Sequence, residues 1–180
     1  MIPAQQFTQH ASHQETVDTR TLRQVCGTFA TGVTVITSGD RGNSVGVTAN
    51  SFTSVSLDPP LVLFCLHKES RVRPVLTATG GFVVNFLAHH QEETAWGFAG
   101  RESARVDEVP HHRSRDGIPV LSQALAFLSC HLVREYDGGD HAILLGEVVD
   151  LGTSGRDEDP LVFYRGQMRV LGDGPTVGRS

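Results

Sequence analysis

The sequence predicts a mainly β fold, an antiparallel barrel with a few helices. Three observations lead to this prediction: valine-rich apolar runs, short turns of Gly, Asp and Asn between them, and no regular alternation of strands with helices. The length of 180 residues fits one domain with a core of ordinary size. Residues 1–18 and 173–180 are polar or glycine-rich and are expected to be flexible tails around a domain that spans residues 19–172.

The first element is expected to be an amphipathic helix. Apolar residues recur at helical spacing from Thr19 onwards, which predicts a helix with Thr19 or Thr21 as its N-cap and Gly32 as its end. The apolar stripe of this helix consists of Leu22, Val25, Cys26 and Phe29.

The apolar runs that follow are expected to be strands, because each is rich in β-branched or aromatic residues and is bounded by turn residues. In chain order they are Val33–Thr37, Ser44–Phe52, Leu61–Leu66, Gly81–Leu87, Phe127–Tyr136, His141–Leu151 and Pro160–Leu171. Two further helices are expected at Arg71–Ala78, with Ser70 as the cap, and at His90–Ala99. The polar stretch Arg101–Pro119 is expected to be a long loop, either functional or mobile.

Composition and charge exclude several classes of protein. Fifteen Lys and Arg against twenty Asp and Glu give a net charge of −5, so binding to nucleic acid is not expected. The longest apolar run, Leu61–Leu66, is far shorter than the ~20 residues that cross a bilayer. The N-terminus lacks the apolar centre of a signal peptide, so we expect a cytoplasmic protein without a membrane segment. The odd number of widely spaced cysteines agrees, and Cys26, Cys65 and Cys130 are expected to be buried free thiols.

Several common catalytic motifs are missing from the sequence. No metal site is expected, because adjacent histidines point in different directions on a strand or helix and no ligand-spaced motif is present. No P-loop, dinucleotide-binding glycine motif or serine hydrolase elbow is present either. The segment Gly46–Pro60 crowds hydroxyl and amide side chains into a few residues. It is interpreted either as an edge strand with a turn, or as an uncharged hydrogen-bonding site for a polar planar ligand and its phosphate.

Three groups of motifs carry a resemblance to a known family. FATGVTVIT with GVTANSFTSVSLDPPLVLFCL, then GFVVNFL with FAG, then GGDHAILLGEVVDL with PLVFYRGQMRVL follow one another between Leu22 and Leu171. In these motifs the sequence resembles the flavin reductase family, whose fold is the FMN-binding split barrel. Its members are reductase components of two-component flavin-dependent monooxygenases. The resemblance implies a homodimeric NAD(P)H:flavin oxidoreductase that reduces FMN or FAD and supplies a monooxygenase partner. The choices between FMN and FAD and between NADH and NADPH stay open, with NADH favoured over NADPH.

The resemblance also implies which residues bind the cofactors. The flavin-binding residues would be Val47, Thr48, Ala49, Asn50, Ser51, Cys65, Leu66, His67, Ser70, Arg71, Phe98 and Ala99. Among these, Ser70 and Arg71 would receive the flavin phosphate at a helix N-terminus, where free N–H groups and the helix dipole favour an anion. The nicotinamide would face His141, Tyr164 and Arg165.

His141 is the candidate catalytic residue. Because the two cofactors carry out the redox chemistry themselves, its expected role is to position the nicotinamide against the flavin. A second interpretation makes His141 a cap of the preceding turn and Arg165 a solvated charge at a strand end. Two other functions stay open: a flavoprotein that holds FMN tightly and reduces another small acceptor, and a non-catalytic flavin-binding module.

Overall fold

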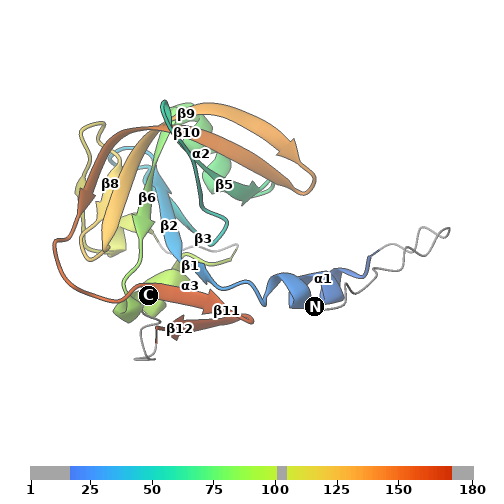
Figure 1. Cartoon of the computed structure of the whole chain (residues 1–180). Coiled ribbons are helices and arrows are strands. Elements are labelled where there is room, and N and C mark those ends of the chain that lie inside the picture. The colour runs from blue at the N-terminus through green and yellow to red at the C-terminus, as the bar shows by residue number, and fades with distance from the viewer. Residues whose placement is uncertain (1–16, 101–104, 172–180) are drawn as a thin grey trace.

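A curled antiparallel sheet of seven strands dominates the computed structural model, which describes residues 17–100 and 105–171 (Figure 1). The strands are β2 (Thr34–Ser38), β3 (Val45–Ala49), β4 (Thr53–Leu57), β5 (Pro60–His67), β6 (Gly81–Phe86), β9 (Ala126–Gly138) and β10 (His141–Thr153). Their order across the sheet is β3-β2-β6-β9-β10-β5-β4, and every neighbouring pair is antiparallel. The prediction of a mainly β, antiparallel fold is therefore confirmed.

The barrel is left open along one seam. The sheet curls until β3 approaches β5, but these two strands share no ladder. The seam is bridged instead by the Ser51 hydroxyl, which accepts a hydrogen bond from the backbone N–H of Cys65 at 2.9 Å. The fold is thus a split barrel, closed on most of its circumference by ladders and at one place by a side chain.

Two smaller sheets complete the β structure. One contains β1 (Thr31–Gly32), β11 (Leu161–Tyr164) and β12 (Gln167–Val170), and the other contains β7 (His111–Arg113) and β8 (Pro119–Leu121). The single strand expected over Pro160–Leu171 is therefore wrong. Arg165 and Gly166 both adopt positive φ angles, of 50° and 78°, which turn the chain back on itself as a tight hairpin.

The first helix, α1 (Thr19–Cys26), is shorter than expected and is capped by a different residue. The carboxylate of Asp18 accepts a hydrogen bond from the backbone N–H of Thr21 at 2.8 Å, so Asp18 is the N-cap in place of Thr19 or Thr21. The pKa of Asp18 is lowered by a hydrogen bond from the Thr21 hydroxyl and, in second place, by this one from the backbone N–H. The helix ends at Gly27, and the expected end at Gly32 is wrong because Gly32 belongs to β1.

The remaining helices lie close to their expected positions. They are α2 (Val72–Thr79), η1 (His89–Gln91), α3 (Glu92–Gly97) and η2 (Val106–Glu108). Helix α2 begins one residue later than predicted, so its N-cap is Arg71 and the expected cap at Ser70 is wrong. The Ser70 hydroxyl, one residue before the cap, accepts from the Val72 N–H at 3.3 Å. The expected loop over 101–119 includes η2 and β7, while residues 101–104 lie outside the described part of the chain. The predicted tails also fall almost wholly outside it.

The main core lies inside the barrel. Phe64 and Phe82 meet edge to face, with ring centroids 5.1 Å apart, and the buried Leu76 of α2 covers one end of the same cluster. Burial raises the pKa of Cys130 to about 12, so this thiol is an inert part of the core, as predicted. Cys65 is only half-buried and Cys26 is exposed, so the expectation of three buried cysteines holds for Cys130 alone.

No helix among residues 17–100 and 105–171 is both long and apolar enough to cross a membrane.

Gly146 provides the space into which the Phe82 ring fits. A Cβ atom at Gly146 would lie 2.4 Å from Cζ of Phe82, a ring already fixed by Phe64. We predict that Gly146→Ala lowers the free energy of unfolding by about 1–3 kcal/mol, the usual cost of overpacking a core. Denaturant unfolding measures this loss. Gly32→Ala is the matched control, since its Cβ would meet nothing within 4 Å, and an equal loss in both variants would contradict the proposed cause.

Candidate functional site

A pocket of about 640 Å³ lies at the open seam of the barrel. This volume is typical of a site for a small organic ligand. Ten of the predicted flavin-binding residues line it: Val47, Thr48, Ala49, Asn50, Ser51, Cys65, Leu66, His67, Ser70 and Arg71. His141 lines it as well. Residues from β3, β5, β10 and the start of α2, which are far apart in the sequence, are therefore brought together in one place.

One wall of the pocket is the strand β3, which is held rigidly from behind. The Thr48 N–H donates to the carbonyl of Phe98 at 3.0 Å, and the Thr48 hydroxyl donates to the carbonyl of Ala95 at 2.6 Å. The Thr48 hydroxyl is therefore already committed to the protein. The exposed amide of Asn50 makes no hydrogen bond to any described side chain or backbone group, so it can serve a ligand.

Neither Phe98 nor Ala99 lines the pocket, and Phe98 lies behind this wall. The Phe98 side chain is fully buried in a second core cluster, and its ring fills the space beneath Gly46, where a Cβ would lie 2.7 Å from it. The prediction that Phe98 and Ala99 close the flavin site is not supported by this placement. Phe98 acts on the pocket indirectly, because its carbonyl fixes Thr48.

The start of α2 gives the pocket its positive charge. Arg71 lines the pocket and is exposed, and no carboxylate among the described residues pairs with it. Its neighbours are neutralised: Lys68 binds Asp137 at 2.7 Å and Arg73 binds Glu135. The first N–H groups of the helix and its dipole point the same way. This corner of the pocket therefore suits an anionic group such as a phosphate.

Two histidines form the other polar part of the lining. His67 and His141 are directly opposed on β5 and β10, and their rings meet edge to face with centroids 5.2 Å apart. Nδ1 of His141 lies 2.7 Å from the carboxylate of Asp140, and this hydrogen bond lowers the pKa of Asp140. Since a carboxylate only accepts, the proton sits on Nδ1 of His141 and leaves Nε2 available to another partner.

Tyr164 and Arg165 lie in a different part of the chain's surface. They form the end of the β11–β12 hairpin, where the Arg165 guanidinium stacks on the Tyr164 ring at 5.1 Å and the Arg165 N–H donates to the carbonyl of Gly27. Neither residue lines the pocket within one chain. Their predicted contact with the nicotinamide stays a prediction.

The pocket also contains residues that the sequence did not single out, namely Gly46, Glu69, Val72 and Gly100. All four are next to predicted residues or motifs. Glu69 immediately precedes Ser70, and Gly100 ends the FAG motif. The signal was therefore position along the chain, because Gly46, Val72 and Gly100 have no polar side chain and the Glu69 carboxylate belongs to no recognised motif. Among the described residues, no group of three or more His, Cys, Asp or Glu side chains could hold a metal ion.

The lining fits a flavin. A planar ring system needs a flat wall with neutral hydrogen-bonding groups, which β3 and Asn50 provide, and its phosphate needs a cation, which Arg71 provides. Fold and site together define a small split barrel whose seam pocket suits a polar, anionic, planar ligand.

Comparison with known proteins places the chain in a family. The model of the flavin reductase like domain matches residues 26–172, so the chain belongs to the flavin reductase family. The reductase subunit HsaB of a flavin-dependent monooxygenase from Rhodococcus jostii is 42% identical, over 91% of this chain and 83% of that protein. An NADH-dependent FAD reductase from Streptomyces globisporus is 41% identical, over 88% of this chain and 89% of that protein. The resemblance found in the sequence is thereby confirmed.

Solved structures agree on the fold. The Streptomyces globisporus NADH:FAD oxidoreductase, in complex with NAD and FAD fragments, superposes with a TM-score of 0.83 and is 39% identical. The alignment covers 93% of this chain and 100% of that one. BorF, the flavin reductase component of a bacterial two-component tryptophan halogenase, gives a TM-score of 0.80 at 41% identity, over 87% of this chain and 100% of that one.

We predict that Arg71→Ala raises the dissociation constant for FMN at least about tenfold, because a charge-assisted hydrogen bond to a phosphate contributes roughly 1.5–3 kcal/mol. Fluorescence titration with FMN measures the change. Riboflavin, which has no phosphate, should bind the variant and the wild type about equally. Arg41→Ala, in an exposed turn away from the pocket, is the matched control. An unchanged affinity for FMN would rule out Arg71 as the phosphate ligand.

Proposed function

We propose that this flavin reductase uses NADH to reduce FMN or FAD in the seam pocket and supplies the reduced flavin to a partner monooxygenase. The observation on which this rests is the pocket itself, which combines a neutral polar wall, a free cation at a helix N-terminus and a histidine pair. The names of the relatives, a monooxygenase reductase subunit and an NADH-dependent FAD reductase, support the same assignment.

The residues of this chain act by binding and aligning the two rings. When bound, the nicotinamide and the flavin supply the electron transfer themselves. The rigid β3 wall orients the flavin ring, Arg71 holds the phosphate, and Asp140 fixes the tautomer of His141. His141 then offers Nε2 as a positioning contact for the nicotinamide. No residue has to act as a nucleophile, which agrees with the lack of a hydrolase motif in the sequence.

The pocket favours a flavin that enters and leaves over one that is held permanently. Of its lining residues, Asn50, His67, Glu69 and Arg71 are exposed, so the ligand would stay in contact with solvent. This supports the flavin as a diffusible substrate over the alternative of a tightly bound FMN. Dialysis of the purified protein separates these alternatives: a colourless protein that oxidises NADH only with added flavin supports the proposal. Rates with each pairing of FMN or FAD with NADH or NADPH would identify the preferred pair.

We also propose that the protein is a homodimer. The strands β5 and β10 are apolar on both faces: their inward side chains are buried, and on the other face Leu63 opposes Leu145 while Cys65 opposes Ile143. A strand that is apolar on both sides is expected to be covered on both sides. We call Leu61, Leu63, Ile143 and Leu145 the outer sheet surface. It adjoins the pocket at Cys65, so a second copy seated there would lie beside the flavin site.

We also propose a cytoplasmic location and a domain that spans residues 19–172, and the family match over residues 26–172 supports the second of these.

We predict that His141→Ala slows flavin reduction by roughly a hundredfold and raises KM for NADH, while FMN affinity stays within about twofold. Misplacement of reacting rings by about 1 Å has an effect of this size. Stopped-flow reduction of the FMN-loaded variant measures the rate, and a melting curve checks the fold. If His141 is only a turn cap, the variant melts earlier but reduces flavin at the wild-type rate. His112→Ala, outside this pocket, is the matched histidine control.

We predict that light scattering gives twice the 19.5 kDa mass of one chain at micromolar concentration. Leu145→Glu places a charge in the outer sheet surface and should shift the protein to monomer, since an unpaired charge is costly in an apolar interface. Val170→Glu, on the exposed strand β12, should leave the dimer intact. A monomeric wild-type protein would contradict the homodimer.

A further inference from the structure

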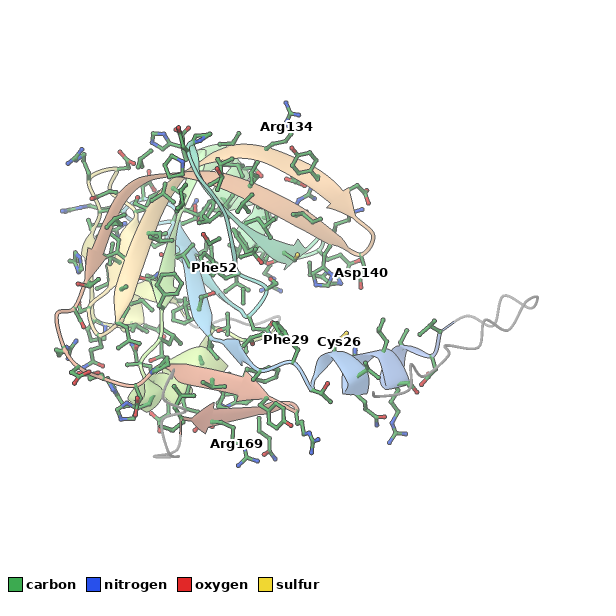
Figure 2. The ribbon with its side chains drawn as sticks, viewed as in Figure 1. Cys26, Phe29, Phe52, Arg134, Asp140 and Arg169 are labelled. Atoms are coloured by element: carbon green, nitrogen blue, oxygen red, sulfur yellow. The ribbon has the colours of Figure 1, made fainter. Side chains whose placement is uncertain are left out.

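The two histidines of the pocket are held in opposite hydrogen-bonding states. The backbone N–H of Glu69 donates to Nδ1 of His67 at 3.2 Å, so this nitrogen carries no proton. Nδ1 of His141 donates instead, to the carboxylate of Asp140 at 2.7 Å, which Figure 2 shows at the turn between β9 and β10. The neutral His67 ring therefore carries its proton on Nε2, and the neutral His141 ring carries it on Nδ1.

The Nε2 atoms are the ring nitrogens that remain for a ligand. Among the residues that the structure describes, none makes a hydrogen bond to either of them. His67 and His141 are direct cross-strand partners on β5 and β10, their ring centroids are 5.2 Å apart, and both line the pocket. The pair therefore presents one N–H donor, on His67, beside one lone-pair acceptor, on His141.

A primary amide has the groups that such a pair can bind. Its C=O accepts and its NH₂ donates, and both are attached to the same carbon, so one amide can bind both histidines at once. A carboxylate or a phosphate anion offers acceptors only and would leave His141 without a partner. The nicotinamide ring carries one such amide. The flavin ring also has neighbouring C=O and N–H groups, but the free amide of Asn50, next to the β3 wall, can serve these.

Position in the pocket also separates the two rings. The flavin is proposed above to lie on the β3 wall, whereas the histidine pair belongs to the opposite edge of the seam, on β5 and β10. On the same face of these strands the next cross-strand pair is Cys65 with Ile143, and both side chains are half-buried. An apolar patch beside a donor and an acceptor suits a flat ring that carries an amide at its edge.

We infer that His67 and His141 bind the carboxamide of the nicotinamide between them, with Nε2–H of His67 donating to its carbonyl and Nε2 of His141 accepting from its NH₂. This inference rests on the proposed function and names the group of NADH that the site recognises. It gives His67, expected from the family resemblance to contact the flavin, a contact with the nicotinamide. Because Glu69 and Asp140 fix the two tautomers, only one orientation of the carboxamide makes both hydrogen bonds.

Substitution of His67 tests the donor. His67→Leu should raise the dissociation constant for NADH about threefold to tenfold, the usual effect of losing one uncharged hydrogen bond. His67→Gln is the matched control, because its side-chain amide keeps an N–H, and it should stay within about twofold of the wild type. The dependence of stopped-flow flavin reduction on NADH concentration gives the constant. An unchanged constant in His67→Leu, or equal weakening by both variants, would overturn the inference.

An analogue of NADH tests the acceptor. The reduced 3-acetylpyridine analogue has a methyl group in place of the amide NH₂, so it keeps the carbonyl for His67 and has no donor for His141. His141→Ala should raise the dissociation constant for NADH about threefold to tenfold, but that for the analogue less than about twofold. His67→Leu should weaken the binding of both compounds. If His141→Ala weakens both compounds equally, the assigned contact is wrong.

Titration with FMN distinguishes this inference from the proposed function. The affinity of His67→Leu for FMN should stay within about twofold of the wild type, because the pair contacts the nicotinamide. A loss of FMN affinity larger than the loss of NADH affinity would mean that the histidines bind the flavin, which overturns the inference and leaves flavin reduction standing. A wild-type protein that does not reduce flavin with NADH would contradict the proposed function itself.

Discussion

The site depends on the way in which the barrel fails to close. A ladder between β3 and β5 would satisfy every backbone group along the seam and leave no room for a ligand. Instead the Ser51 hydroxyl accepts from the N–H of Cys65 and lies 3.3 Å from its carbonyl, so one short side chain takes over both backbone groups. The two edges of the seam are joined at this point, and both residues of the bridge line the pocket.

The strand β3, which forms one wall of the pocket at the open seam, is held in place by contacts on its other side. Thr48 is fixed by two carbonyls from the α3 region, and the buried Phe98 ring fills the space under Gly46. These contacts therefore prevent the strand β3, which faces the ligand, from moving toward the core. A site that aligns two rings gains most from a wall of this kind, because positional error directly raises the barrier to reaction. The few polar groups that the protein has not already used, on Asn50 and Arg71, are left for the ligand.

Much of the fold and most of the pocket could be predicted from the sequence, because strand patterning and motif order are local signals. The ten predicted lining residues came from the order of family motifs along the chain; hydroxyl and amide content marked only the segment Gly46–Pro60. The predictions that were wrong concern features that depend on tertiary contacts, which no local sequence pattern encodes. The reversal at Arg165 needs a positive φ at a non-glycine residue. The exposure of Cys26 and the burial of Phe98 were missed because the same apolar residue can face a core, a partner or a ligand.

The ion pairs on either side of Arg71 determine how a ligand approaches. Because Asp137 neutralises Lys68 and Glu135 neutralises Arg73, the charges left unpaired at this corner, among the described residues, are the cation of Arg71 and the carboxylate of Glu69, on a chain of net charge −5. A flavin phosphate at long range is therefore repelled by the protein as a whole, and it is attracted only within about one Debye length, ~8 Å at physiological ionic strength. Salt screens both effects at once. Binding of the ligand should then depend on short-range contacts in the pocket. Its association rate constant should barely respond to ionic strength and should lie well below the limit for electrostatically steered association.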